Sequence, residues 1–208
     1  MCKDKGSDAR TGRCVWPGKL LAWYRNFIFS RKKFDTPNSA IFAAQFQDMS
    51  YFKDKVIVIT GGSEGIGKAL IEALIPLGAK IATCGRNHDK LYSLQMRHAG
   101  TLLHTVACDV SKEQDCKRFI ESIINTFGGI DILINNAGIS MRALVKDVDI
   151  EVMRKVMDVN FFGAVYCSTF ALPSITERKG SIVGISSIAG YRGLPGRSAY
   201  SASKFALQ

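Results

Sequence analysis

Several kinds of residue are scarce in this sequence of 208 residues, and each scarcity excludes a class of protein. Five prolines and nineteen glycines are too few for a collagen-like chain. The six cysteines form no C-x-x-C pair, and the three histidines share no metal-ligand spacing, so we expect neither a disulfide framework nor a metal site. The cysteines are typical of reduced, buried thiols in a reducing compartment, which predicts a cytoplasmic protein.

Long apolar runs are also absent. The uncharged stretch 159–176 is long enough for a marginal membrane span, but Asn160, Gly163 and Pro173 make it too polar and irregular for hydrocarbon. We expect it to belong to a buried helix that ends near Pro173. A secretory signal peptide is not predicted, since Lys19 and Arg25 interrupt the apolar stretch near the N-terminus.

Acidic residues are outnumbered, with 18 Asp and Glu against 28 Lys and Arg, which gives a net charge of +10. Residues 1–48 carry half of this excess, with nine basic and four acidic side chains. The remainder of the chain is only mildly basic, so we expect no nucleic-acid partner. Apolar residues make up 47% and charged residues 22%, which is the composition of a globular domain.

The sequence divides into a basic N-terminal extension, 1–48, and a domain, 49–208. The first part of the extension is polar and charged, and is predicted to be disordered. Residues 19–33 have apolar side chains at helical spacing beside basic ones, which is typical of an amphipathic helix on a membrane surface or a partner. That helix would make the protein peripherally membrane-associated. Alternatively the helix packs on the domain, or the extension is absent from the mature protein, because Met49 would be a natural start.

From Lys55 onward, short apolar runs alternate with segments of helical periodicity. Strands are predicted at 56–59, 80–84, 102–107, 130–134 and 181–185. Helices are predicted at 66–77, 89–97, 111–127 and 150–172, and from 198 onward. Ser111 and Gln114 suit a capping box at the start of the third helix. This alternation predicts an α/β fold with a parallel sheet covered by helices on both faces.

A glycine-rich segment, 60–67, follows the first strand and opens a helix, with Gly61, Gly65 and Gly67 in it. Backbone N–H groups at such a strand-to-helix turn bind the pyrophosphate of a dinucleotide. The spacing Gly-x-x-x-Gly-x-Gly differs from the general Gly-x-Gly-x-x-Gly fingerprint. On its own, it fits an ordinary glycine-rich turn equally well.

Further polar motifs end two later strands. The Asn-Asn-Ala-Gly segment 135–138 ends the fourth strand and a Ser-Ser pair with Ser187 ends the fifth, both at the edge where α/β sheets bind ligands. Asn160 lies within the long apolar helix, and Tyr200 and Lys204 lie one helical turn apart. Taken singly, Ser187 fits a strand-end cap, Asn160 a helix-bending amide, and the Tyr–Lys pair a solvated pair.

Taken together, in this order and spacing, the motifs resemble the short-chain dehydrogenase/reductase family from about Tyr51 to the end of the chain. The resemblance implies a doubly wound, Rossmann-like sheet with strand order 3-2-1-4-5. It implies catalytic roles for Asn160, Ser187, Tyr200 and Lys204. It implies a cofactor site formed by Gly61, Ser63, Gly65, Ile66, Gly67, Arg86, Asp109, Val110, Asn136, Ala137, Gly138, Tyr200 and Lys204. In that site, Asp109 would contact the adenine and Asn136 would stabilise the central strand.

The chemistry of carbonyl reduction agrees with these roles. Hydride addition needs a proton donor at the developing alkoxide, which the Tyr200 hydroxyl can supply. Lys204 would stabilise the phenolate and Ser187 would orient the carbonyl oxygen. Asn160 would hold a water that links Lys204 to solvent. We therefore expect a small-molecule carbonyl or alcohol substrate, whose identity the sequence does not disclose.

The cofactor is predicted to be NADP rather than NAD. NAD-binding proteins of this class carry an acidic residue at the end of the second strand, which holds the ribose 2′-hydroxyl. Gly85 stands there instead, and the guanidinium of Arg86, the next residue, suits a 2′-phosphate. One departure is Glu64, at a position that is often basic in relatives that select the phosphate.

The family's catalytic domain usually continues well past the Tyr-x-x-x-Lys helix, whereas this chain stops four residues after Lys204. We therefore expect a fold that is incomplete at its C-terminal end, with an unprotected fifth strand and a weakly supported catalytic helix. Such a chain is expected to be poorly soluble and nearly inactive, and a complete form to be a homo-oligomer. The alternative is a truncated, inactive cofactor-binding or interaction protein whose basic extension contacts a membrane or a partner.

Overall fold

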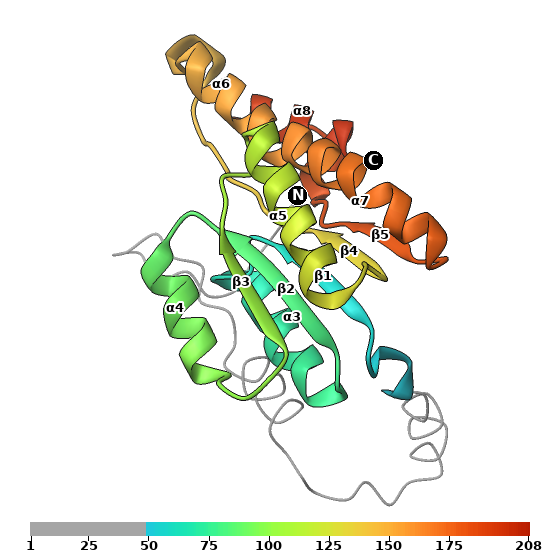
Figure 1. The fold of residues 1–208 in the computed structure, drawn as a ribbon. Helices are drawn as coiled ribbons and strands as arrows, with labels where there is room; N and C mark the ends of the chain where they lie inside the picture. The colour runs from blue at the N-terminus through green and yellow to red at the C-terminus, as the bar shows by residue number, and fades with distance from the viewer. Residues whose placement is uncertain (1–48) are drawn as a thin grey trace, which may run out of the picture. The chain divides into compact units, whose positions relative to one another are not determined.

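The computed structural model describes residues 49–208, and the predictions for residues 1–48, the helix at 19–33 included, lie outside them. Five parallel strands form one sheet in the order β3-β2-β1-β4-β5 (Figure 1). They are β1 (Val56–Thr60), β2 (Lys80–Gly85), β3 (Leu103–Ala107), β4 (Ile132–Asn135) and β5 (Ser181–Gly184). The predicted α/β class, parallel sheet and strand order are confirmed.

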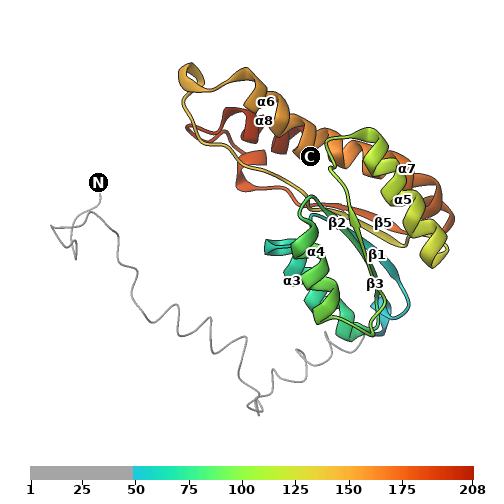
Figure 2. The same cartoon turned by 60° about the vertical axis from the view of Figure 1, so that its left-hand side comes forward.

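Helices connect the strands and cover both faces of the sheet (Figure 2). The α-helices are α3 (Gly65–Leu74), α4 (His88–Arg97), α5 (Glu113–Phe127), α6 (Ile150–Met157), α7 (Gly163–Glu177) and α8 (Ser198–Ala206). A π-helical segment, η4 (Asp158–Phe162), joins α6 to α7. Short 3₁₀ helices are η1 (Met49–Phe52), η2 (Ile75–Leu77), η3 (Val145–Asp147) and η5 (Ile188–Gly190).

Strand β1 contributes to a separate hydrophobic core on each face of the sheet. Val56 and Val58 belong to the core formed with α5 and α7, whereas Ile57 and Ile59 belong to the core formed with α3 and α4. All four side chains are buried. Because side chains alternate along a strand, an uninterrupted β-branched run fits a strand that is covered on both faces. Because helices cover both faces, the sheet remains open at the carboxyl ends of its strands.

The predicted capping box at Ser111 is wrong. Helix α5 begins at Glu113 with Lys112 as its N-cap residue, one position later than a Ser111 cap requires. The Ser111 hydroxyl instead donates to the Asp109 carboxylate at 2.8 Å. A serine hydroxyl that is hydrogen-bonded within the preceding turn does not cap the helix.

The prediction that the long helix ends near Pro173 is also wrong, because α7 continues through the proline to Glu177. Just beyond the proline, Ser174 Oγ accepts a hydrogen bond of 2.9 Å from the backbone N–H of Ile130, and Ile175 is buried. These tertiary contacts hold the last turn in place despite the backbone hydrogen bond that proline cannot donate. The predicted single helix 150–172 is in fact α6, η4 and α7 in succession.

A buried carboxylate ties elements together at the opposite edge of the sheet. Asp131, just before β4, accepts from the Val56 N–H at 2.9 Å. It also forms ion pairs with Lys55 at 3.4 Å and with Arg178 at 3.2 Å. Through this one side chain, the starts of β1 and β4 are joined to the end of α7.

Strand β5 is exposed along its whole length. Ile182 and Val183 keep 42% and 41% of their surface exposed. In the part of the chain that the structure describes, no helix is long and apolar enough to cross a membrane. The uncharged stretch 159–176 lies in η4 and α7, whose residues Cys167 and Ala171 are buried in the core.

Candidate active site

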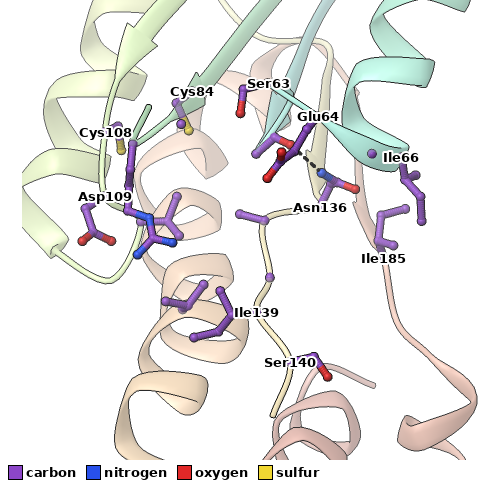
Figure 3. A pocket seen from close by; sticks show the side chains of 18 of the residues that line it. Ser63, Glu64, Ile66, Cys84, Cys108, Asp109, Asn136, Ile139, Ser140 and Ile185 are labelled. Atoms are coloured by element: carbon purple, nitrogen blue, oxygen red, sulfur yellow. Dashed lines mark hydrogen bonds between the residues drawn. The ribbon is translucent and has the colours of Figure 1, made fainter. Parts of the chain in front are cut away.

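The carboxyl ends of the strands enclose a cavity of about 580 Å³ (Figure 3). It is lined from the glycine turn after β1, from the ends of β2, β3 and β4, from the segment after β5 and from α8. All of the predicted cofactor residues line it except Gly67. They are Gly61, Ser63, Gly65, Ile66, Arg86, Asp109, Val110, Asn136, Ala137, Gly138, Tyr200 and Lys204. The predicted catalytic residues Asn160 and Ser187 are not among the residues that line it.

The glycine turn is fastened to the end of β4. Gly61 has a positive φ of 69°, and a Cβ on it would lie 2.9 Å from the Ala137 Cα, so only glycine fits. The Thr60 hydroxyl accepts from the backbone N–H groups of Asn136 and Ala137, both at 3.0 Å. The Asn136 side chain donates in return to the carbonyl oxygens of Thr60 and Gly61 at 2.8 and 3.1 Å. The turn therefore keeps its shape through contacts within the protein.

Gly67 shapes the cavity without lining it. A Cβ on Gly67 would lie 2.6 Å from Asn136 Nδ2 and 2.7 Å from the Gly61 carbonyl oxygen. The absence of a side chain there lets the first turn of α3 approach the glycine turn. Gly65 and Ile66 at the start of α3 line the cavity, and the N-terminus of a helix is where backbone N–H groups bind a pyrophosphate.

The end of β2 presents a basic, sterically tight corner. A Cβ on Gly85 would lie 3.2 Å from the Ser63 hydroxyl oxygen, so a larger residue would press on Ser63. Arg86 is exposed and lines the cavity beside it. Glu64 pairs with Lys90, whose hydrogen bond and charge hold the pKa of the Glu64 carboxyl below its usual value. Sequence reasoning missed Lys90, because nothing in its local pattern pairs it with Glu64.

The adenine end of the predicted site lies by Asp109, near Cys84 and Cys108 (Figure 3). Asp109 Oδ1 accepts from the backbone N–H of Ser111 at 3.1 Å as well as from its hydroxyl. The pKa of the Cys108 thiol is raised mainly by its hydrogen bond with Cys116, and to a smaller extent by its hydrogen bond with Cys84 and by burial. Cys84, Cys108, Cys116 and Cys167 are all free and buried, as predicted, whereas the first two cysteines of the chain lie outside the described residues. These thiols are core side chains.

Tyr200 and Lys204 reach the cavity from α8. Lys204 is 95% buried, and its ammonium donates to the Ile185 carbonyl oxygen at 2.7 Å. Burial lowers the pKa of Lys204. The Arg197 guanidinium carbon lies 5.6 Å from the centre of the Tyr200 ring, where it makes a cation–π contact. The phenol and the ammonium thus line the same cavity as the glycine turn.

Helix α8 has more tertiary support than we expected. Its residues Ala199, Ser201, Ser203 and Lys204 are buried. The Ser201 hydroxyl accepts from the Leu194 N–H at 3.3 Å. A Cβ on Gly190 would lie 2.6 Å from the Lys204 carbonyl oxygen, so η5 packs directly against α8. These contacts support the helix within the described residues, whereas the expected lack of partners from later strands stays a prediction.

Asn160 is buried and connects three segments. Its Oδ1 accepts from the Ile139 N–H at 2.7 Å, while Nδ2 donates to the Ile139 carbonyl and to Ser203 Oγ, both at 2.9 Å. Both amide hydrogens are thus used within the protein, so a water could reach this side chain only at Oδ1. A Cβ on Gly138 would lie 3.3 Å from Asn160 Oδ1 and 3.7 Å from Lys204 Nζ, which places both groups around Gly138.

Ser187 acts as a cap in this structure. It is the N-cap residue of η5, and its hydroxyl oxygen accepts from the Ala189 N–H at 3.2 Å. The neighbouring Ser186 lines the cavity instead. Since Ser187 accepts in this contact, its own hydroxyl hydrogen stays available for a substrate oxygen.

Comparisons with known proteins agree on one family. The sequence model of a family described as "short chain dehydrogenase" matches residues 55–208. The chain is 40% identical over 171 residues to "Dehydrogenase/reductase SDR family member 7B" of Mus musculus, with 79% of this chain and 53% of that protein covered. It is also 40% identical over 159 residues to "11-beta-hydroxysteroid dehydrogenase-like 2" of Arabidopsis thaliana, with 74% and 51% covered. The chain thus spans about half the length of these relatives.

Two solved structures share this fold. One is a short chain dehydrogenase/reductase from Burkholderia phymatum in complex with NAD, with a TM-score of 0.71 and 28% identity over 74% of this chain and 57% of that one. The other is NAD⁺-bound xylitol dehydrogenase, with a TM-score of 0.71 and 31% identity over 74% and 61% of the two chains. Both structures contain a nicotinamide cofactor.

Proposed function

The chain belongs to the short-chain dehydrogenase/reductase family, and from this membership we propose that it is an oxidoreductase that uses NADP(H) to interconvert a carbonyl compound and an alcohol. One observation carries the proposal: Tyr200 and Lys204 line the same cavity as the glycine turn and Arg86. A proton donor beside a dinucleotide-binding turn is what hydride transfer to a carbonyl requires.

Tyr200 is the proposed general acid. Its hydroxyl gives a proton to the developing alkoxide during reduction and takes it back during oxidation. Lys204 favours the resulting phenolate through the charge of its ammonium, one turn further along α8. The hydrogen bond of Lys204 to Ile185 fixes the direction of that ammonium.

Ser187 and Asn160 support this donor in different ways. The Ser187 hydroxyl donates to the substrate oxygen and polarises the carbonyl, while its own oxygen remains bound to the Ala189 N–H. Asn160 is a positioning residue, because it links the segment after β4 to Ser203 in the middle of the catalytic helix. Asn160 Oδ1 has a second lone pair beside its bond to the Ile139 N–H, so the expected water would bind there.

The residues of the cavity fit a nicotinamide dinucleotide. The glycine turn leaves space that any Cβ on Gly61 would fill, and the start of α3 offers N–H groups to the pyrophosphate. Asp109 and Val110 would hold the adenine end, and Asn136 to Gly138 the middle of the cofactor. When bound, the nicotinamide supplies or accepts the hydride.

The preference for NADP rests on the corner formed by Gly85. The acidic side chain that holds a ribose 2′-hydroxyl in NAD-binding relatives is absent at Gly85, and a side chain there would need Ser63 to shift slightly, since a Cβ would lie 3.2 Å from its hydroxyl oxygen. Arg86 and Ser63 instead offer donors to a phosphate. The two solved relatives are NAD complexes, which makes NAD the competing choice.

Measurements of cofactor binding test the NADP assignment, and measurements of turnover test Tyr200 as the proposed general acid. We expect the chain to bind NADPH more tightly than NADH, and Arg86→Asp to reverse the order, because a charge-assisted bond to the phosphate contributes about 1.5–3 kcal/mol. NADPH absorbance is then followed with a panel of ketones and aldehydes. Tyr200→Phe should abolish the low turnover expected of the unmodified chain, while cofactor binding stays intact. Equal turnover in Tyr200→Phe would remove the proposed acid, and equal affinity for both cofactors would remove the NADP assignment.

A further inference from the structure

An ion pair borders the ribose end of the cavity. Glu64 precedes the first turn of α3, Lys90 lies in the first turn of α4, and their side chains are paired. Both side chains are substantially exposed, at 69% for Glu64 and 49% for Lys90. Both residues line the main cavity and also a neighbouring cavity of about 400 Å³. The pair therefore stands between the two cavities.

The pair compensates for an acidic group in an unfavourable place. Glu64 lies next to Ser63, at the side of the cavity where the 2′-phosphate is proposed to bind (Figure 3). Lys90 keeps Glu64 ionised, as the lowered pKa of Glu64 indicates, and cancels its charge. An unpaired carboxylate there would repel a phosphate.

Lys90 is also placed to reach the phosphate. Its backbone N–H donates to the Asn87 side chain at 2.9 Å, which caps α4 directly after Arg86. Lys90 and Arg86 therefore extend from the same short segment to the same end of the cavity. The ammonium of a lysine is a point charge on a flexible stem, so an exposed lysine can change partner without a backbone movement.

We propose that Lys90 is a specificity-determining residue that exchanges its bond to Glu64 for the 2′-phosphate of NADP(H). A phosphate carries more negative charge than one carboxylate and has several acceptor oxygens, so it competes successfully for the ammonium. NADH offers no phosphate, and Lys90 then stays with Glu64. This inference rests on the proposed function, because it requires that NADP(H) binds in this cavity.

A set of charge-removing variants tests the exchange by calorimetric titration with NADPH and with NADH. The variants are Lys90→Gln, Glu64→Gln and the double variant, with Lys68→Gln and Glu72→Gln as matched controls. Lys68 and Glu72 form a partly exposed ion pair on α3, at 3.4 Å; Lys68 lines the neighbouring cavity, but neither residue lines the main cavity. The readout is the ratio of the two affinities, which a general loss of structure would leave unchanged.

We expect Lys90→Gln to weaken NADPH binding about fivefold and to leave NADH binding nearly unchanged, as for a partly exposed ionic contact. Glu64→Gln should tighten NADPH binding about twofold, because it removes a competitor and a repulsive charge. The double variant should recover part of the loss seen in Lys90→Gln. The controls should match the unmodified chain, and added salt should shrink all differences.

Different outcomes separate this inference from the proposed function. If the unmodified chain prefers NADPH and Lys90→Gln leaves the preference unchanged, or weakens both cofactors equally, Lys90 has no role in selection and only this inference fails. If the unmodified chain binds NADH as tightly as NADPH, the NADP assignment itself fails and the inference falls with it.

Discussion

Three polar side chains around the cavity donate to backbone carbonyl oxygens. Asn136 donates to the end of β1, Asn160 to the chain after β4, and Lys204 to the chain after β5. The positions of these acceptors are fixed by the sheet, so the side chains are oriented before any ligand binds. A site whose donors need no rearrangement loses little free energy when charge develops in it.

The protonation of one histidine should control acid stability. Burial lowers the pKa of His104, whose ring packs edge-on against Phe127 and lies 3.1 Å from the Ser122 hydroxyl. Protonation therefore favours the unfolded chain, in which histidine has its ordinary pKa of about 6.5. The stability contributed by neutral His104 should be complete above that pH and should fall as the pH drops through it towards the lower pKa of the folded state.

Urea unfolding at pH 7.5 and at pH 5.5 measures this effect. The decrease in unfolding free energy between the two pH values should be smaller in His104→Gln than in the unmodified chain, because the variant has no titratable side chain at position 104. An identical decrease in both would assign the acid sensitivity to other groups.

Residues whose role follows from a motif could be predicted from the sequence, and residues whose role follows from a distant contact could not. Tyr200 and the glycine turn belong to motifs whose residue spacing is visible in the sequence, and the structure brings them to one cavity. The partners Glu64 and Lys90 are 26 positions apart and are joined only when α3 and α4 fold beside each other. Ser187 was predicted to face the ligand, yet its local cap bond to Ala189 depends on the exact turn after β5.

The helical stretch from α6 to α7 shows how packing overrides local rules. The proline rule predicts an end near Pro173, but contacts of Ser174 and Ile175 extend the helix by another turn. The π-helical segment η4 lies around Asn160, where the side chain binds the chain after β4. Such segments are frequent at functional sites, and no sequence periodicity reveals them. Element existence follows from pattern, whereas these irregularities follow from tertiary contacts.

Loss of the Asn160 side chain should loosen α8. Asn160→Ala leaves the partly buried N–H and carbonyl of Ile139 without the Asn160 partner and removes the link to Ser203, which should cost about 2–3 kcal/mol of unfolding free energy. Amide hydrogen exchange in α8 should become faster. Ser168→Ala is the control, because it removes a comparable 3.0 Å contact to Asn135 that does not reach α8. Equal exchange in α8 in both variants would show that Asn160 does not position that helix.

The sheet of the described domain is shielded from solvent around β1 but not around β5. The sheet is covered on both faces around β1, where two cores meet, whereas β5 is exposed along its length at one edge. Leu172 and Phe205 add further exposed apolar surface, at 52% and 48%. An edge strand with unpaired backbone groups and no charged or proline residue is a site for pairing with another chain. The half of the domain that forms the glycine turn therefore should be well ordered in solution, while the half around β5 governs association.

We expect the 208-residue chain to associate with itself through β5 and to show low turnover for that reason. Ile182→Lys places a charge on the exposed edge, where it should oppose strand pairing and reduce the sedimenting mass at micromolar protein concentration. Tyr92→Lys is the control, since Tyr92 is also exposed, at 63%, but lies on α4. The charge on β5 should raise solubility and the share of monomer, and any carbonyl-dependent oxidation of NADPH should rise with that share. Equal association of both variants would exclude the β5 edge as the contact, and a fully monomeric chain that remains inactive would show that the low turnover has its cause within the site.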